Sequence, residues 1–212
     1  MAVRIQVFAR APVSGEVKTR LIPRLGADSA ARLQMTLTEH AIATAASAGI
    51  GPVELWCSPD RAHPTFEAFA ARGIVLREQQ TGTIGERMYR ALSDALRAGD
   101  SAILIGSDCP SLTAQDLRDA AQTLRMETDF AFVPAEDGGY VLIAAAPRVQ
   151  SCLHRIFDEI DWGTSQVMDQ TRGRLGELGR VWHELAPRWD IDRPEDYDRL
   201  LHEQPGLLET VP

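Results

Sequence analysis

One aspartate stands where a short apolar run stops abruptly. Residues Ala102 to Ile105 are all apolar, which favours a strand buried on both faces of a parallel sheet. Gly106-Ser107-Asp108-Cys109-Pro110 follows and ends the strand, because proline cannot donate to a ladder. Asp108 is therefore predicted at the edge where open α/β sheets bind ligands. Two interpretations stay open: Asp108 is a ligand for a hard metal ion, or it only caps the turn.

A cluster of cations follows the first predicted strand. Four basic residues fall within fifteen positions that hold a single acid, Glu16, although the whole chain has 30 acidic and 22 basic residues: Arg10, Lys18, Arg20 and Arg24. One charge pair at ~4 Å is worth roughly 4 kcal/mol at an effective dielectric near 20, so several cations around one pocket can hold a diphosphate. The alternative is a solvated, charged surface loop.

The loop that carries these cations is long and irregular, and such loops inside compact domains tend to be functional. Gly15 permits close approach of the backbone to a ligand. The segment Gly15-Glu16-Val17-Lys18-Thr19 is not a Walker A loop, because it lacks the glycine immediately before the lysine and the first glycine of that motif. We interpret the segment as a phosphate-binding loop of another kind.

Three further acids come after predicted strands. Asp137 lies in Glu136-Asp137-Gly138-Gly139, which is either a hairpin turn or a second carboxylate at the ligand-binding edge. Asp190 is a candidate for the same cleft, whereas Asp192 is predicted as a helix N-cap ahead of Pro194. Cys109 has no histidine or arginine nearby in sequence to assist a thiol nucleophile, so we expect a packed thiol.

Composition limits the class of protein. The chain has 212 residues, 44% of them hydrophobic, and a formal net charge of −8, which disfavours nucleic acid as a partner. Three cysteines without zinc-like spacing favour a reduced, cytoplasmic protein. Nothing approaches the ~20 apolar residues of a membrane span.

Predicted strands alternate with predicted helices along the chain. Strands are expected at Val3–Ala9, Val53–Cys57, Gly73–Glu78, Ala102–Ile105, Phe130–Pro134, Tyr140–Ala145 and Val181–Leu185. Helices are expected near 28–48, 64–71, 83–98, 113–126, 149–159, 165–178 and 194–202, with capping boxes at Thr83-x-x-Glu86 and Thr113-x-x-Asp116. This alternation predicts one three-layer α/β domain over residues 1–203, with a mainly parallel sheet and a loose tail over 204–212. The link between the sixth and fifth strands is too short for a crossover helix, so these strands are antiparallel or lie apart.

The order of the motifs resembles a known family. The segments FARAPVSGEVKTRLIPRLG, GERM, IGSDCPSL, PAEDGGYVLI, WGTSQV and DIDRPEDY resemble the radical-SAM/selenodomain-associated glycosyltransferase-like family, which is linked to arsenosugar biosynthesis. The resemblance covers Phe8 to Tyr197 and implies the GT-A fold of nucleotide-diphospho-sugar transferases, a mixed sheet with one antiparallel strand near Tyr140. It also implies a nucleotide over the edge of the first strand.

The resemblance implies roles for particular residues. Those implied to bind the nucleotide are Ala9, Arg10, Ala11, Gly15, Lys18, Thr19, Arg20, Gly82, Gly85 and Arg87. Asp108 would correspond to the metal-binding acid of the D-x-D element and would hold Mg²⁺ or Mn²⁺. Position 106 is glycine, so either the second ligand comes from elsewhere, with Asp137 and Asp190 as the candidates, or the metal is held weakly.

Three hypotheses about function follow. The first is a metal-dependent glycosyltransferase that uses a nucleotide-diphospho-sugar and a small-molecule acceptor, with Asp108, Asp137 and Lys18 as the catalytic residues. The second is a nucleotidyltransferase that releases pyrophosphate from a nucleoside triphosphate, since Lys-Thr-Arg-Leu at 18–21 also resembles phospholactate guanylyltransferases. The third is a nucleotide-binding module without catalytic activity.

Overall fold

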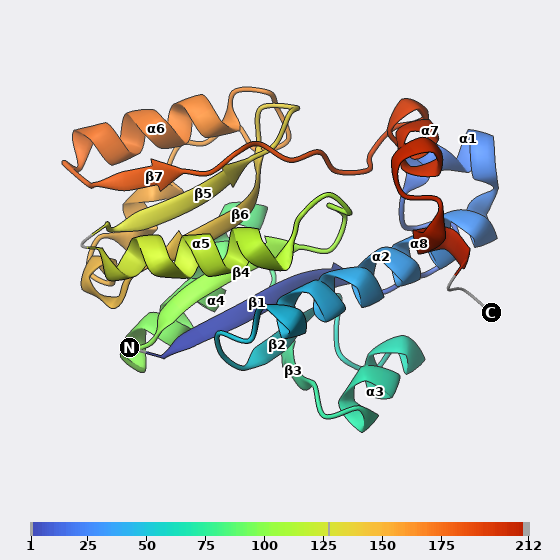
Figure 1. The fold of residues 1–212 in the computed structure, drawn as a ribbon, viewed down its shortest axis with the longest axis horizontal. Helices are drawn as coiled ribbons and strands as arrows, with labels where there is room; N and C mark the ends of the chain where they lie inside the picture. Colours follow the sequence, from blue (N-terminus) through green and yellow to red (C-terminus); the bar gives the residue numbers. More distant parts are fainter. Residues whose placement is uncertain (1, 127, 210–212) are drawn as a thin grey trace.

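Seven strands form one mixed sheet in the computed structural model, which describes residues 2–126 and 128–209 (Figure 1). Their order across the sheet is β3-β2-β1-β4-β6-β5-β7. The strands are β1 (Val3–Arg10), β2 (Val53–Ser58), β3 (Val75–Glu78), β4 (Ser101–Gly106), β5 (Phe130–Pro134), β6 (Tyr140–Ala145) and β7 (Trp182–Glu184). Every predicted strand is confirmed, with boundary shifts of one or two residues.

One strand, β6, runs against the others. It is antiparallel to both of its neighbours, β4 and β5, whereas all the other pairs are parallel. The five residues between Pro134 and Tyr140 make a hairpin connection, too short for the crossover that a parallel pair would need. The mixed, mainly parallel sheet is therefore confirmed, including the antiparallel strand near Tyr140.

Helices cover both faces of the sheet and make three layers. They are α1 (Ile22–Leu25), α2 (Ala27–Ala48), α3 (Pro64–Ala71), α4 (Ile84–Arg97), α5 (Ala114–Arg125), α6 (Val167–Glu177), α7 (Pro194–Glu203) and α8 (Gly206–Glu209). Apolar side chains of α2, α3 and α5 pack on one face, and those of α4 and α6 pack on the other. Strand residues alternate between these two cores, for example Ile103 in the first and Leu104 in the second. Both predicted capping boxes are present, at Thr83 and Thr113.

A third apolar cluster joins the two ends of the chain. It contains Leu21 from the loop after β1, Leu33 and Leu37 from α2, and Trp189, Ile191 and Leu200 from the C-terminal segment. Figure 1 shows α1, α7 and α8 gathered at one end of the molecule, beyond the sheet. The long loop after β1 is therefore fixed by residues about 170 positions later in the chain, through pairs such as Arg20 with Asp192.

Two segments differ from the sequence-based expectation. Residues 149–159 do not form an α-helix; i,i+3 hydrogen bonds give 3₁₀ turns at Pro147–Val149 and Leu153–Ile156, and Glu159 has a positive φ of 53°. The predicted helical spacing of the buried residues Val149, Leu153 and Ile156 is kept. In the tail expected to be loose, Gly206–Glu209 forms α8, which packs on the third cluster; residues 210–212 lie outside the described residues. No helix in the described ranges could cross a membrane.

Candidate active site

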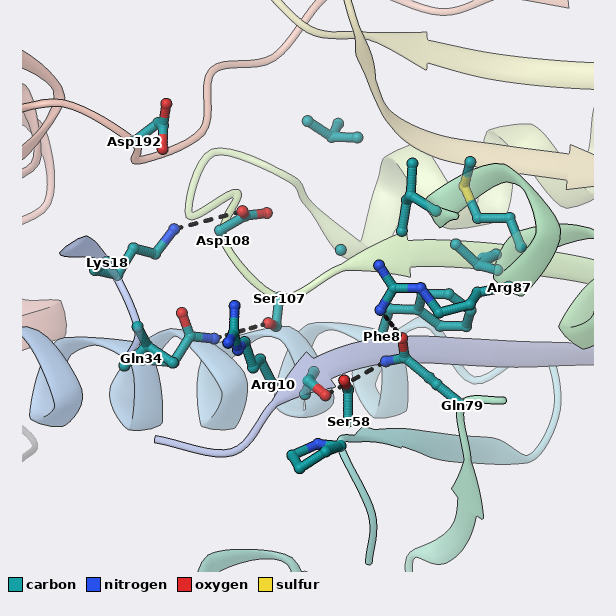
Figure 2. Close-up of a pocket in the computed structure, with 18 of the residues that line it drawn as sticks. Phe8, Arg10, Lys18, Gln34, Ser58, Gln79, Arg87, Ser107, Asp108 and Asp192 are labelled. Atoms are coloured by element: carbon teal, nitrogen blue, oxygen red, sulfur yellow. Dashed lines mark hydrogen bonds and ion pairs between the residues drawn. The ribbon is translucent and has the colours of Figure 1, made fainter. Parts of the chain in front are cut away.

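The carboxyl ends of the parallel strands bring the predicted site residues to one edge of the sheet. In register, Arg10 of β1 pairs with Ser58 of β2, and Phe8 pairs with Gly106 of β4. Because β6 is antiparallel, its first residue, Tyr140, lies at the same edge. A cleft of about 1030 Å³ opens there (Figure 2). The predicted residues that line it are Ala9, Arg10, Lys18, Thr19, Arg20, Gly82, Arg87 and Asp108.

Lys18 and Asp108 meet at one end of this cleft. The Lys18 Nζ atom lies 3.4 Å from Asp108 Oδ2 and donates a hydrogen bond of 2.5 Å to the Ile191 carbonyl oxygen. The lysine side chain is only 7% exposed, whereas the aspartate side chain is 43% exposed. Lys18 has left-handed backbone angles, with φ 46° and ψ 41°, which are uncommon for a residue with a side chain. The loop therefore holds a buried cation against an accessible carboxylate.

Two arginines lie elsewhere in the cleft. Arg87 lies in the first turn of α4, and its Nη1 donates a hydrogen bond of 2.9 Å to Gln79 Oε1. Burial lowers the pKa of Arg87, and the nearby positive charge of Arg10 lowers it further. Neither guanidinium has an ion pair within the described ranges. An anion in the cleft would find two cations there whose charge is not yet compensated.

Sequence reasoning missed two glutamines that support this edge. Gln79 follows β3, and its amide nitrogen donates to the carbonyl oxygens of Trp56 (2.7 Å) and Ala9 (3.4 Å). Its place just after a strand could have identified it. Gln34, in α2, donates a hydrogen bond of 3.1 Å to the hydroxyl of Ser107, the residue before Asp108. Its only signal is a large polar side chain among the mostly apolar buried residues of this helix, which also include Thr36 and Thr38.

The remaining cations of the loop pair with the C-terminal segment. Arg20 pairs with Asp192, and both line the cleft, whereas Arg24 pairs with Asp198 outside it. The prediction of Asp192 as a helix N-cap is wrong. Arg193 holds the N-cap position of α7, and the Asp196 carboxylate accepts the backbone N–H groups of Asp192 and Arg193. The Asp192 side chain instead forms an ion pair with Arg20.

Asp190 lies close to two other acids. Its pKa is raised to about 7, mainly by burial and then by the negative charges of Asp108 and Asp137, while Lys18 opposes them. Asp137 is exposed, and its Oδ1 accepts a 3.0 Å hydrogen bond from the Gly139 N–H in a tight turn. Three carboxylates therefore lie at the same sheet edge, and only Asp108 lines the cleft itself. A cation there would relieve the repulsion that raises the pKa of Asp190.

The family of the chain can be stated. The model of the DUF2064 family, described as "Uncharacterized protein conserved in bacteria", matches residues 41–164, which is more than half of the chain. The chain belongs to DUF2064. No curated protein matches its sequence. The matched region contains Gln79, Arg87, Asp108 and Asp137, while Lys18 and Asp190 lie outside it.

Solved structures share the fold of this DUF2064 protein over its whole length. A candidate nucleotide-diphospho-sugar transferase from Desulfovibrio desulfuricans G20 matches with a TM-score of 0.83 and 27% identity, over 100% of this chain and 99% of that chain. A nucleotidyl transferase from Methanothermobacter thermautotrophicus matches with a TM-score of 0.67 and 18% identity, over 99% of each chain. CMP:2-keto-3-deoxy-manno-octonic acid synthetase in complex with CTP matches with a TM-score of 0.64 and 13% identity, over 97% of this chain and 99% of that chain. The nucleotide-diphospho-sugar transferase-like fold is thus confirmed.

Several predicted residues of the DUF2064 protein lie outside the cleft lining: Ala11, Gly15, Gly85, Asp137 and Asp190. A Cβ atom on Gly85 would lie 2.7 Å from the Trp162 ring, so this glycine permits a close contact between α4 and an aromatic side chain. Cys109 is the packed thiol that was expected: it is 5% exposed, burial raises its pKa to about 12, and its Sγ atom lies 3.2 Å from the Trp189 carbonyl oxygen.

Proposed function

We propose that this DUF2064 protein is a transferase that binds a nucleotide-diphospho-sugar and moves the sugar to a small-molecule acceptor. The observation that carries the proposal is the contact between Lys18 and Asp108 at one end of a cleft large enough for a nucleotide-sugar. The match at 27% identity to a candidate nucleotide-diphospho-sugar transferase supports the same activity. A diphosphate placed between these residues would meet a cation on one side and a metal-binding acid on the other.

Mg²⁺ or Mn²⁺ fits the acidic side chains at this edge. Asp108 would be the first ligand and Asp190 the second, with Asp137 as the other candidate for second ligand. Among the described residues, no three His, Cys, Asp or Glu side chains are grouped closely enough to form a metal cage. That arrangement suits Mg²⁺, which proteins commonly hold through one or two carboxylates while phosphate oxygens and waters complete the shell. When bound, such an ion neutralises charge on the diphosphate as the sugar–phosphate bond breaks.

The residues of the chain have distinct roles in this proposal. The Lys18 ammonium group would turn from Asp108 to the leaving diphosphate, where negative charge grows in the transition state. Arg20, already in the cleft, would add a second cation there. The exposed carboxylate of Asp137 would orient the acceptor hydroxyl and take its proton. Cys109 takes no part, because a buried thiol whose pKa is about 12 is not a nucleophile at neutral pH.

Nucleotidyl transfer is the second candidate, and two matched structures favour it. One is named as a nucleotidyl transferase and the other is a synthetase bound to CTP. The same parts would serve: an acceptor oxygen attacks the α-phosphorus of a nucleoside triphosphate, the bond to the β-phosphate breaks, and Lys18 and Arg20 hold the pyrophosphate that leaves. The two candidate functions therefore differ in their product.

Product analysis tests the proposal. Purified protein with Mn²⁺ would be incubated with panels of nucleotide-diphospho-sugars and of nucleoside triphosphates, together with pooled hydroxyl-bearing and anionic acceptors. The resemblance noted in the sequence adds arsenosugar precursors to the acceptor pool. We expect free nucleoside diphosphate from the sugar donors, abolished in Asp108→Asn and retained in Asp158→Asn, which changes an exposed aspartate. Pyrophosphate from the triphosphates would favour the second candidate, and neither product would refute both.

A further inference from the structure

Arg10 and Arg87 form a pair of cations without a counter-ion. Most arginines of the chain have a carboxylate within 4.0 Å, as Arg20 has in Asp192 and Arg188 has in Asp116. In the part of the chain that the structure describes, the Arg10 side chain makes no hydrogen bond or ion pair, and the Arg87 guanidinium has only the neutral Gln79. Two guanidinium groups that repel each other therefore share one cleft, and neither has a carboxylate within 4.0 Å among the described residues.

Burial makes the uncompensated charge of Arg87 more unfavourable. Its Nε–H group is buried and has no hydrogen-bond acceptor among the described residues. A guanidinium group stays charged at physiological pH, so the protein cannot relieve the cost by losing a proton. A buried donor without a partner destabilises the protein, and the effect is larger when the group is charged. A ligand that accepts hydrogen bonds and carries negative charge would remove both penalties together.

The surroundings of Arg87 fix its guanidinium group in place, apart from Lys18. Gln79 holds the Arg87 guanidinium and is itself fixed by hydrogen bonds to the backbone of β1 and β2. Figure 2 shows Arg87 apart from Lys18 and Asp108, with Arg10 drawn between them. The lining of the cleft also includes the apolar side chains of Met88 and Leu104. Arg87 is therefore a cation held apart from Lys18, and the positive charge of Arg10 lies near enough to lower its pKa.

We propose that Arg10 and Arg87 form a second anion subsite, which binds a carboxylate or phosphate group of the substrates beyond the diphosphate held at Lys18 and Asp108. The proposal rests on the proposed function for the position of that diphosphate. A neutral nucleobase could accept hydrogen bonds from the arginines but would leave two positive charges uncompensated, so an anionic group is the better match. The acceptor or the transferred group would then be an acid.

Calorimetric titration tests the subsite without knowledge of the natural substrate. Protein loaded with Mg²⁺ and pyrophosphate would be titrated with inorganic phosphate, with malonate and with neutral nucleosides. We expect phosphate or malonate to bind, and the one that binds more tightly identifies the anion. The affinity should fall at least tenfold in Arg87→Met and in Arg10→Met. It should not change in Arg97→Met, which alters an exposed arginine at the other end of α4.

Pyrophosphate affinity, measured first, separates this proposal from the proposed function. If pyrophosphate does not bind, the proposed function is at fault, and the anion titrations are repeated on the free protein. The subsite is refuted if neither anion binds, or if both arginine variants bind them as the wild type does. It is equally refuted if the variants lose affinity for nucleosides alone, because the pair then recognises a base. Arg10 is exposed, so Arg10→Met gives a result even if Arg87→Met fails to fold.

Discussion

The Lys18 Nζ atom lies 3.4 Å from Asp108 Oδ2, although the two residues are 90 positions apart in the sequence. Lys18 is the only lysine in the chain, against 21 arginines. It also donates to the Ile191 carbonyl, so the loop after β1, the end of β4 and the C-terminal segment meet at one ammonium group. Lysine presents a compact point charge on a flexible stem, which suits a group that turns between a carboxylate and a phosphate.

Replacing this lysine removes the cation but keeps an apolar stem of similar length. In Lys18→Met, we expect turnover to fall by about 10²- to 10³-fold, the usual cost of losing one donor to a developing negative charge. Steady-state kinetics with the donor identified by product analysis measures the loss. Because there is a single lysine, reductive methylation offers a second readout: Mg²⁺ and pyrophosphate should protect Lys18, and mass spectrometry of its peptide follows the protection. Equal methylation with and without the ligand would contradict contact between Lys18 and the diphosphate.

The raised pKa of Asp190 predicts how stability depends on pH. The carboxyl group has a pKa of about 7 in the folded protein and about 3.8 in the unfolded chain. Its ionisation therefore leaves the free energy of unfolding unchanged below pH ~4 and lowers it by up to ~4 kcal/mol above pH ~7. Asp190→Asn should therefore increase the free energy of unfolding at pH 8 and change it little at pH 4. Chemical denaturation at both values, with Asp158→Asn as control, measures this. An equal effect at both values would show that Asp190 is not a buried acid.

The same variant tests the role of Asp190 toward a metal ion. If Asp190 is the second ligand, Mn²⁺ should stabilise the wild type against denaturation at pH 8 and should stabilise Asp190→Asn much less. Undiminished stabilisation of the variant would assign the second ligand to Asp137 instead.

The hydrogen bond from Gln34 to Ser107 gives a prediction about positioning. Both residues are 6% exposed, and Ser107 directly precedes Asp108. Gln34→Leu leaves the Ser107 hydroxyl without this donor and loosens the turn, so we expect the affinity for Mg²⁺-pyrophosphate to fall several-fold. Gln115→Leu, at an exposed position of α5, should leave the affinity unchanged. Calorimetry on the two variants decides the matter, and equal affinities would assign Gln34 a purely structural role.

The contact of Gly85 with Trp162 predicts a loss of stability. A methyl group at Gly85 would meet three ring atoms at 2.7 to 2.8 Å, so Gly85→Ala should destabilise the fold by about 1–3 kcal/mol. Gly173→Ala is the matched control: its Cβ would meet nothing within 4 Å, and alanine in a helix should stabilise by up to ~1 kcal/mol. Thermal denaturation gives both values. Loss of pyrophosphate affinity in Gly85→Ala without loss of stability would instead place this glycine in the ligand site.

Local patterns in the sequence were enough to predict the sheet. Apolar runs marked the strands, unbroken in β4, β5 and β6, and turn residues after β1 and β4 marked the edge where Asp108 lies. The short link after Pro134 predicted the unusual relation of β5 and β6, because five residues cannot cross a sheet. The α-helix predicted over residues 149–159 was wrong, because helical spacing of buried side chains does not distinguish an α-helix from successive 3₁₀ turns.

Much of the candidate site depends on contacts between distant parts of the chain. The sequence placed Lys18, Arg20 and Arg24 together, but which of them faces the cleft depends on how the loop packs on Ile191 and Leu200. Gln34 acts through a residue 73 positions away, and no local pattern predicts that pairing. The Asp192 prediction failed because α7 begins at Pro194 with Arg193 as its N-cap, and the Asp192 carboxylate pairs with Arg20 instead.

The most direct test of the account is the affinity of the protein for pyrophosphate with Mn²⁺ and with EDTA, in the wild type and in Asp108→Asn. Asp108 and Lys18 are proposed to hold a metal-bound diphosphate between them. Wild-type binding should therefore weaken at least tenfold when the metal is removed. Asp108→Asn should bind weakly under both conditions. A variant that binds pyrophosphate as tightly as the wild type, and with the same dependence on Mn²⁺, would contradict the account.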